Sequence, residues 1–432
     1  MDQLPRKLGL LDATMIVIGI VIGSGIFLLP NLIARGLHSG VAIIGVWIVA
    51  GILSAFGAFA YAELGAMMPH TGGQYVYLRE AYGDMWGFLC GWVFVIAVIP
   101  GGTAFLATGF SIYLAHFIPL SPWERIGVSV ALVGVLSAIN YTGVREGAWT
   151  QRIFTTAKIG GLALLIGGAL LAPHTGQSTE AAVSYSGFGI AMAACLMAYN
   201  GWSYVSFIAG EVTEPQRNLP RSLWLGMAAV MVLYVSANVG YMNVMTVPEI
   251  AAAERVGATV AERIAGPMGA SALSVVVLLS IIGAINGCVL TGARIPFAQA
   301  RDGLFFSHFG HIHPKYRTPS FSIAVQALWS GVLIVTGSYE TLADYSILSA
   351  WVFYTMSVAA VWVLRKKRPE LARPHRMWGY PFTLWSFLIV SVWFLIDALV
   401  NQPKVSIIAL LFGAAGIPFY YVWRSRNGAP TR

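Results

Sequence analysis

The segment Gly23-Ser24-Gly25-Ile26-Phe27 interrupts an apolar run that extends from Leu10 to Ile33. This run is long enough to cross a bilayer, which requires about 20 apolar residues. Each glycine inside a helix costs roughly 1 kcal/mol relative to alanine, so the segment predicts a break within a membrane-spanning helix. Broken backbone at membrane depth is tolerated only where it is buried in protein or lines a cavity. A second half-helix would then begin near Ile26.

The start of such a half-helix favours a negatively charged group. Its first N–H groups have no acceptor within the helix, and they form the positive end of the helix dipole. Carboxylates and other anions bind at this position. The alternative interpretation is that the small residues only allow close packing with a neighbouring helix. The pattern of the remaining chain distinguishes the two interpretations.

The composition is that of an integral membrane protein. The chain has 432 residues, of which 57% are hydrophobic and 10% are charged, and its mean hydropathy is +0.72. Soluble domains carry about 25% charged residues. The first apolar run is not followed by a small-residue cleavage site, which argues against a signal peptide. Cys90, Cys195 and Cys288 lie in apolar runs without metal-ligand spacing, so we expect neither disulfides nor a metal site.

The hydropathy pattern predicts twelve membrane-spanning helices. With the N-terminus in the cytoplasm, 20 of the 26 Lys and Arg residues fall inside, 5 fall outside and 1, Lys158, lies within a span. This bias predicts a plasma-membrane protein with both termini in the cytoplasm, and it explains the net charge of +8 without a nucleic-acid partner. The predicted spans are 11–34, 40–67, 86–116, 124–143, 152–172, 187–209, 222–246, 269–299, 321–337, 342–364, 381–400 and 404–423.

The sixth predicted span is interrupted in the same way as the first. Tyr199-Asn200-Gly201-Trp202-Ser203 places an amide side chain and a glycine in the middle of an apolar helix. Two broken spans at matching positions indicate a transporter built from two inverted repeats, with the substrate site between the breaks. We therefore expect one transmembrane domain, residues 1–432, with repeats at about 9–172 and 187–366 and a helix pair appended at about 381–423.

Lys158 is the most costly residue of the predicted spans. Even mild insertion scales assign about 2.5–3.5 kcal/mol to a lysine at the centre of a span. One interpretation is that Lys158 reaches the cytoplasmic interface, because Arg152 lies only six residues earlier. We favour the alternative that its ammonium faces the first broken span, at the position of a coupling cation. The neighbouring Thr155-Thr156 and Gly160-Gly161 suit a tight protein interface.

Several motifs resemble the amino acid–polyamine–organocation (APC) superfamily, and within it the L-type amino acid transporter branch. The resemblance extends over nearly the whole chain. It implies an all-α fold of five plus five inverted-repeat helices, with discontinuous first and sixth helices, followed by helices eleven and twelve. It also implies alternating access, usually as sodium-independent exchange of amino acids. The motifs are Ile22-Gly23-Ser24-Gly25-Ile26-Phe27, the stretch Tyr61 to Tyr82, Ala198-Tyr199-Asn200-Gly201-Trp202, the stretch Glu211 to Pro220, and Ala300-Arg301-Asp302-Gly303.

The resemblance also implies how a substrate would bind. The N–H groups of Ser24, Gly25 and Ile26 would bind the carboxylate of the amino acid. Its ammonium would bind carbonyl groups freed by the breaks, around Val21, Met197 and Asn200. Lys158 resembles a lysine of this branch that reaches toward the first and eighth helices, near the ion site of sodium-coupled relatives, which makes sodium coupling unfavourable.

Two positions depart from the pattern of the family. The gate residue of the sixth helix is usually aromatic, and here Met197 holds that position, so either the gate is looser or Tyr199 or Trp202 forms it. Eukaryotic members carry a cysteine between the third and fourth spans that links an accessory glycoprotein. The corresponding loop, residues 115–123, has none. We therefore expect a stand-alone bacterial member in the inner membrane, without a disulfide-linked subunit.

Together these features predict a secondary active transporter of L-amino acids, with no catalytic residue and no cofactor. Neutral substrates are favoured because the breaks supply only neutral polar groups. Exchange is the favoured mode; the alternative is proton symport through Lys158, because burial makes a lysine release its proton more readily. An intramembrane enzyme is disfavoured, since no nucleophile–base pair or metal set is predicted at membrane depth.

Overall fold

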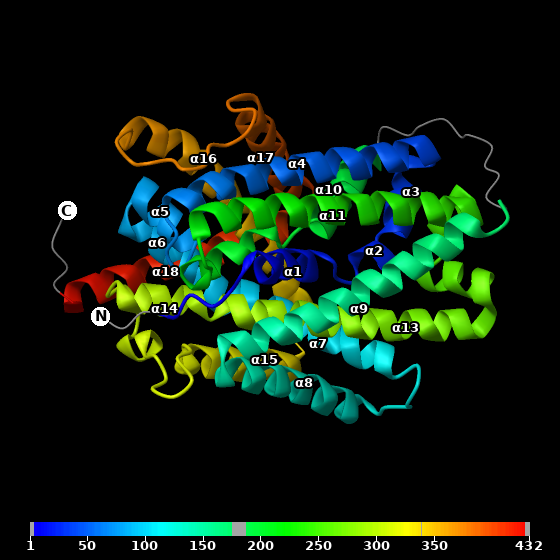
Figure 1. The fold of residues 1–432 in the computed structure, drawn as a ribbon, viewed down its shortest axis with the longest axis horizontal. Helices are drawn as coiled ribbons and strands as arrows, with labels where there is room; N and C mark the ends of the chain where they lie inside the picture. Colours follow the sequence, from blue (N-terminus) through cyan, green and yellow to red (C-terminus); the bar gives the residue numbers. More distant parts are fainter. Residues whose placement is uncertain (1–3, 175–186, 338, 428–432) are drawn as a thin grey trace.

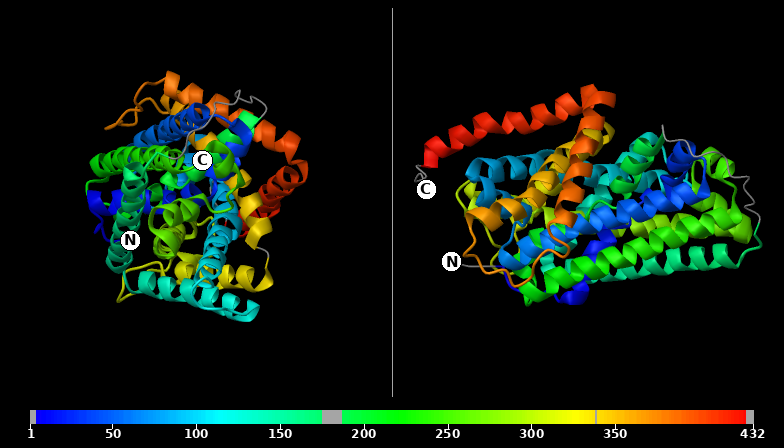
Figure 2. Two further views of the ribbon diagram at one scale, coloured as in Figure 1. Left: turned by 90° about the vertical axis from the view of Figure 1, so that its right-hand side faces the viewer. Right: turned by 90° about the horizontal axis from the view of Figure 1, so that it is seen from above.

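The computed structural model describes residues 4–174, 187–337 and 339–427, and apart from one isolated bridge between Leu8 and Val212, all regular structure in these ranges is helical. The long helices run side by side along one bundle, and the first described residues and the end of the last helix lie at the same end of it (Figures 1 and 2). Helices satisfy their own backbone hydrogen bonds, as a chain in lipid requires. The prediction of an all-α membrane protein is confirmed.

Ten helical segments of the described residues are long and apolar enough to cross a membrane. The other two predicted spans correspond to the broken sixth helix and to α15 (Ser320–Thr336), an apolar helix of 17 residues. The remaining elements are α4 (Gly40–Met67), α5 (Gln74–Tyr82), α6 (Asp84–Val93), the π-helix η1 (Phe94–Val98), α7 (Ile99–Leu114), α8 (Pro122–Thr142), α9 (Val144–Leu171), α11 (Pro215–Val244), α12 (Val247–Ala252), α13 (Val256–Gly292), α14 (Arg294–Arg301), η4 (Ser307–Gly310), α16 (Tyr339–Lys367), α17 (Phe382–Asn401) and α18 (Pro403–Asn427).

Three helices begin well before the predicted starts of their spans. These are α9, α11 and α13, which begin at Val144, Pro215 and Val256. The N-terminal part of each of these helices carries charged residues, so hydropathy excludes that part from the predicted span. The helix itself nevertheless extends beyond the apolar segment. The early part of α13 also contains an interruption, at Ala265 and Gly266.

The first helix is broken where the sequence predicts. α1 (Leu10–Val21) ends before residues 22–24, and α2 (Gly25–Leu28) begins directly after them. α3 (Pro30–Leu37) follows, and Leu29 between α2 and α3 keeps right-handed helical dihedral angles. The half-helix therefore continues in one direction beyond the break.

The sixth helix is also broken. α10 (Phe188–Ala198) is separated by residues 199–201 from the 3₁₀ helix η3 (Trp202–Glu211). Gly201 has a φ of +119°, a conformation that glycine adopts readily and other residues rarely adopt. A Cβ atom there would lie 2.7 Å from Cγ2 of Ile20 on α1. Glycine is thus required both by the turn and by the close approach of the two broken helices.

The broken helices lie inside the bundle and are fixed at one end. α1 packs against α9, α11, α13 and η3, while α4 lies along α11 and α9 lies along α13 (Figure 1). The N–H groups of Lys7 and Leu8 donate to the carbonyl of Glu211 at the end of η3. The Glu211 carboxylate in turn binds Arg294 on α14, and both side chains are fully buried. The repeat boundaries at 172, 187 and 366 stay predictions.

Candidate functional site

Three consecutive N–H groups at the first break lack a backbone acceptor among the described residues. They belong to Ser24, Gly25 and Ile26, whereas the flanking N–H groups of Gly23 and Phe27 donate to nearby carbonyls at 2.9 and 3.1 Å. Ser24 and Gly25 are also partly exposed. Unpaired N–H groups are costly when no ligand or water reaches them. Their position at the start of a half-helix suits a small anionic group.

Tyr234 on α11 connects the two breaks. Its hydroxyl lies 2.9 Å from the carbonyl oxygen of Val21 and 3.2 Å from that of Ala198, the last residues of α1 and α10. Its ring is fully buried and lies edge-on to Trp47. One buried side chain therefore orients freed carbonyl groups from both broken helices.

Sequence analysis did not identify Tyr234. A signal was present, because Tyr234 and Tyr241 lie seven residues apart and so share one face of α11. The Tyr241 hydroxyl lies 3.4 Å from the carbonyl oxygen of Ile26, beyond the first break. Two hydroxyl groups on one face of an apolar helix indicate that this face contacts freed backbone.

Lys158 lies beside the first break. Its side chain is 1% exposed. Its ammonium donates to the carbonyl oxygens of Gly19 and Ile22 on the first helix, at 2.8 and 2.6 Å, and of Ser280 on α13, at 2.9 Å. The three N–H bonds of a lysine ammonium are thus all used. The Lys158 ammonium therefore faces the first broken helix; whether it replaces a coupling cation stays a prediction.

A buried network of polar side chains connects α9, which carries Lys158, to α1, α8 and α13. Asn140 on α8 donates to Asn286 on α13, and Asn286 donates to Gln151 on α9, each at 2.8 Å. Gln151 donates to Thr155 at 3.3 Å, and Thr155 donates to the carbonyl of Met15 on α1 at 3.2 Å. These bonds fix α9 against α1 and α13 and so hold Lys158 in place. These hydrogen bonds were not predicted from the sequence.

The carbonyl groups predicted to bind an ammonium differ in their present partners. Val21 accepts from the Tyr234 hydroxyl and from the N–H of Gly23, and Met197 accepts from the N–H of Asn200 at 3.1 Å. The carbonyl of Asn200 has no recorded donor among the described residues. All three lie at the breaks, but whether they bind substrate stays a prediction.

The three predicted gate residues have different surroundings. Met197 is 39% exposed, whereas Tyr199 and Trp202 are buried. Tyr199 lies 5.0 Å from Tyr234, ring centre to ring centre, and Trp202 lies 5.0 Å from Tyr61. In this structure both aromatic rings pack against other helices, so Met197 is the most accessible of the three. Their roles in gating stay predictions.

The half of the first helix that follows the break is held by α12. Arg35 on α3 donates to the carbonyl of Ala251 at 2.7 Å, and Asn31 donates to that of Ala253 at 2.9 Å. Glu249 at the start of α12 pairs with Arg263 at 2.6 Å. Hydrogen bonds from Arg263 lower the pKa of the Glu249 carboxyl to about 2. This pair therefore stays charged at any pH used to measure transport.

Comparison with known proteins gives relatives over the whole chain. Residues 8–417 match the family described as "Amino acid permease". The serine/threonine exchanger SteT of Bacillus subtilis (strain 168) is 31% identical over 433 residues, which cover 99% of each chain. The large neutral amino acids transporter small subunit 2 of Mus musculus is 33% identical over 442 residues, covering 97% of this chain and 81% of that protein. The b(0,+)-type amino acid transporter 1 of Homo sapiens is 29% identical over 434 residues, which cover 98% of this chain and 88% of that protein. The chain belongs to the amino acid permease family.

Proposed function

We propose that this protein exchanges neutral L-amino acids across the plasma membrane by alternating access, without sodium. The observation that carries the proposal is the pair of helix breaks joined by Tyr234, one of which presents three N–H groups without acceptors in the described part of the chain. Transporters built from inverted repeats bind substrates between such breaks. The relatives named as exchangers and amino acid transporters support the same activity.

The breaks offer complementary groups to a zwitterion. The substrate carboxylate would bind the N–H groups of residues 24–26, at the positive end of the half-helix. The substrate ammonium would bind the carbonyls of Val21, Met197 and Asn200. A carbonyl oxygen has two lone pairs, so Met197 keeps one for a ligand, whereas Val21 would have to exchange one of its present donors. The part-exposed Met197 side chain would then lie beside the substrate side chain.

Neutral substrates fit this arrangement better than cationic ones. The break segments, residues 21–26 and 197–202, contain no acidic residue. A cationic side chain would therefore enter the membrane interior without a partner of opposite charge, which is costly.

The contacts of Lys158 favour exchange over the two coupled modes. Freed carbonyl groups are the ligands that bind Na⁺ in related folds. Here two of them, those of Gly19 and Ile22, accept hydrogen bonds from an ammonium, which also donates to the carbonyl of Ser280 within α13. A sodium ion at the same place would be repelled. Proton release would leave two N–H bonds for three carbonyls, so one of the three buried hydrogen bonds from Lys158 would be lost. We therefore assign Lys158 as a fixed cation.

The bundle end that carries the N-terminus and the end of α18 is assigned to the cytoplasm. This follows from the excess of Lys and Arg in the segments at that end, including the Arg365-Lys366-Lys367-Arg368 cluster. No disulfide-linked partner is required by this proposal, since the loop of residues 115–123 has no cysteine.

The test is uptake of a labelled neutral amino acid into proteoliposomes in sodium-free buffer. Vesicles preloaded with unlabelled amino acid should accumulate label, whereas empty vesicles should not. Uptake into empty vesicles driven by an inward proton gradient would show that the protein is a proton symporter and not an exchanger. If a panel of amino acids gave no uptake in either case, the assignment of the substrate class would be wrong.

A further inference from the structure

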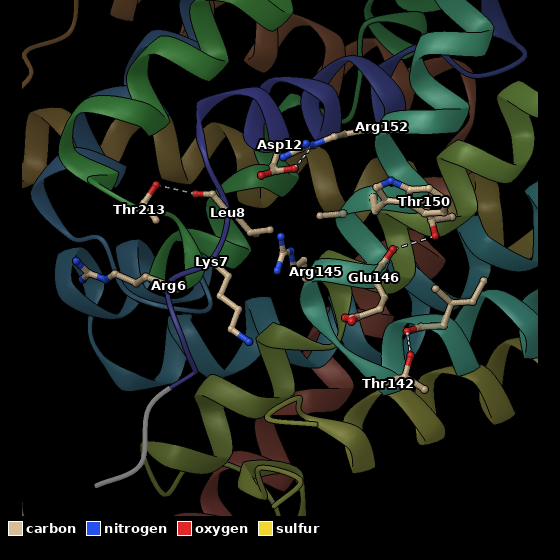
Figure 3. A pocket seen from close by; sticks show the side chains of 13 residues that line it. Arg6, Lys7, Leu8, Asp12, Thr142, Arg145, Glu146, Thr150, Arg152 and Thr213 are labelled. Atoms are coloured by element: carbon tan, nitrogen blue, oxygen red, sulfur yellow. Dashed lines mark hydrogen bonds and ion pairs between the residues drawn. The ribbon is translucent and has the colours of Figure 1, made fainter. Parts of the chain in front are cut away.

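A charged pocket of about 1020 Å³ opens at the cytoplasmic end of the bundle, away from the two breaks. It lies between the N-terminal segment and the adjoining ends of α8 and α9 (Figure 3). Thr213, just after η3, also lines it. The charged residues of the lining are Arg6, Lys7, Asp12, Arg145, Glu146 and Arg152.

The cations of this pocket exceed its available anions. Arg152 is paired with Asp12, with 2.5 Å between Nε and Oδ1. The side chains of Arg6, Lys7 and Arg145 have no recorded partner among the described residues, and all three are exposed. Glu146 is the remaining acid, and its carboxylate lies against Gly143 at the start of α9, where it complements the helix dipole. The pocket is therefore suited to a negatively charged ligand.

One face of α9 runs from this pocket toward the membrane interior. Arg145, Trp149 and Ile153 are spaced by four residues, so their side chains follow one another along that face. Trp149 is 64% exposed and Ile153 is 42% exposed. The spans of α8 and α9 are each only 28% buried inside the protein, which makes them peripheral helices. The order along the face is cation, interfacial tryptophan and aliphatic side chain.

We propose that this pocket binds the headgroup of an anionic phospholipid from the cytoplasmic leaflet. Lys7 and Arg145 would bind the phosphate, since guanidinium and ammonium groups form strong charge-assisted hydrogen bonds with phosphate oxygens. An acyl chain would lie along Trp149 and Ile153. Basic pockets at helix ends on the cytoplasmic side have this property in membrane proteins. A soluble phosphate compound would satisfy the cations but would leave the apolar face uncovered.

The bound headgroup would also connect moving parts of the transporter. Lys7 precedes Leu8, and both donate backbone hydrogen bonds to Glu211 at the end of η3. Arg145 belongs to the first turn of α9. A phosphate between Lys7 and Arg145 would therefore hold the start of the first helix and the end of the sixth against α9.

The test uses the full-length protein purified in an uncharged detergent. Short-chain phosphatidylglycerol or phosphatidylcholine is added, and the midpoint of thermal unfolding gives the apparent affinity. Phosphatidylglycerol should stabilise the protein, and phosphatidylcholine should not. The double variant Lys7→Gln/Arg145→Gln should bind phosphatidylglycerol roughly 30-fold more weakly, because each basic contact near an anionic surface contributes about a factor of five. Both side chains are exposed, so the variant should fold.

Arg376→Gln is the matched control, since Arg376 is an exposed base without a recorded partner among the described residues and lies outside this pocket. It should leave the affinity unchanged. An equal loss of phosphatidylglycerol affinity in Arg376→Gln, or no loss in the double variant, would mean that the lipid is attracted by the basic surface in general. The proposed headgroup site would then be wrong. Inorganic phosphate is the second probe. If it stabilised the protein as well as phosphatidylglycerol, and Trp149→Ala left lipid affinity unaltered, the ligand would be a soluble phosphate and the lipid assignment would fail.

Discussion

The two helix breaks differ in what surrounds them. At the first break, three N–H groups have no acceptor within residues 4–174, 187–337 and 339–427, and a buried ammonium binds two carbonyls of the same helix. At the second break, the turn is made by Gly201 with a positive φ, and the flanking Tyr199 and Trp202 are buried among aromatic rings. The first break is polar and is held by hydrogen bonds from the Lys158 ammonium, whereas the second is held by the packing of aromatic side chains.

This difference assigns separate tasks to the two breaks. Groups at the first break can recognise charge that every amino acid carries, because backbone N–H groups do not depend on the substrate side chain. The second break brings Met197, which is partly exposed, together with rigid aromatic packing. We therefore expect selection among side chains to depend on the second break, and a change at either break to affect a different measured property.

The largest effect is expected from Gly25→Val at the first break. A Cβ there would lie 3.3 Å from Cδ1 of Leu29 and 3.6 Å from Ala198, so the fold can accommodate the side chain. Its methyl groups would nevertheless occupy the space beside the free N–H groups. Exchange should fall below detection in proteoliposomes while the amount of folded protein is retained.

The control for Gly25→Val is Gly160→Val on α9, where a new Cβ meets nothing within 4 Å. It introduces the same side chain into a membrane helix without approaching either break. Exchange by Gly160→Val should be close to normal. Uptake that survives Gly25→Val would contradict the binding of a carboxylate at this half-helix.

The next largest effect is expected from Lys158→Ala. The carbonyl of Gly19 would lose its buried donor, whereas that of Ile22 would keep the Ser280 hydroxyl. A hydrogen bond to a charged group is worth about 1.5–3 kcal/mol. Turnover should therefore fall by roughly 10- to 100-fold, as measured by initial rates of exchange at saturating substrate. Thr156→Ala, at an exposed position of the same helix, is the control. Unaltered kinetics in Lys158→Ala would remove the lysine from the mechanism.

The sequence predicted the features that conflict with a membrane-spanning helix. Glycine pairs, an asparagine and a lysine are each costly in an apolar span, so both breaks and Lys158 stand out without structural information. Tyr234 and Ser280, whose hydroxyl donates to the carbonyl of Ile22 at 3.0 Å, were missed because tyrosine and serine are tolerated in spans. Only tertiary packing brings them to the freed carbonyls.

The orientation of the candidate gate residues also could not be predicted from the sequence. Helical periodicity assigns residues to faces only while the helix is continuous, and residues 199–201 end that continuity. Tyr199 therefore remained a gate candidate in the sequence, whereas the structure packs its ring beside Trp47 and Tyr234. Met197, before the break, is the residue left accessible.

A smaller effect, on stability, is expected from Gly201→Ala at the second break. Alanine is strained at a φ of +119°, which costs about 1–3 kcal/mol, and its Cβ would also approach Ile20. The midpoint of thermal unfolding in detergent should fall. Gly23→Ala at the first break is the matched control, because a Cβ there meets nothing within 4 Å and Gly23 has no positive φ. Equal destabilisation by both changes would mean that the breaks do not differ in packing.

The smallest effect is expected from Tyr234→Phe, which removes only the hydroxyl between the two breaks. Val21 keeps the N–H of Gly23 as a donor, so the loss is about one neutral hydrogen bond, worth roughly 0.5–1.5 kcal/mol. The KM for a neutral amino acid should rise about 2- to 10-fold, with a smaller change in maximal rate, because Tyr234 orients carbonyls that we propose bind the substrate ammonium. Tyr241→Phe removes a hydroxyl seven residues further along the same face of α11, which lies 3.4 Å from the carbonyl oxygen of Ile26. This change should affect KM less. If both variants raised KM equally, the link between the breaks would have no special role in binding, and the two breaks would act independently.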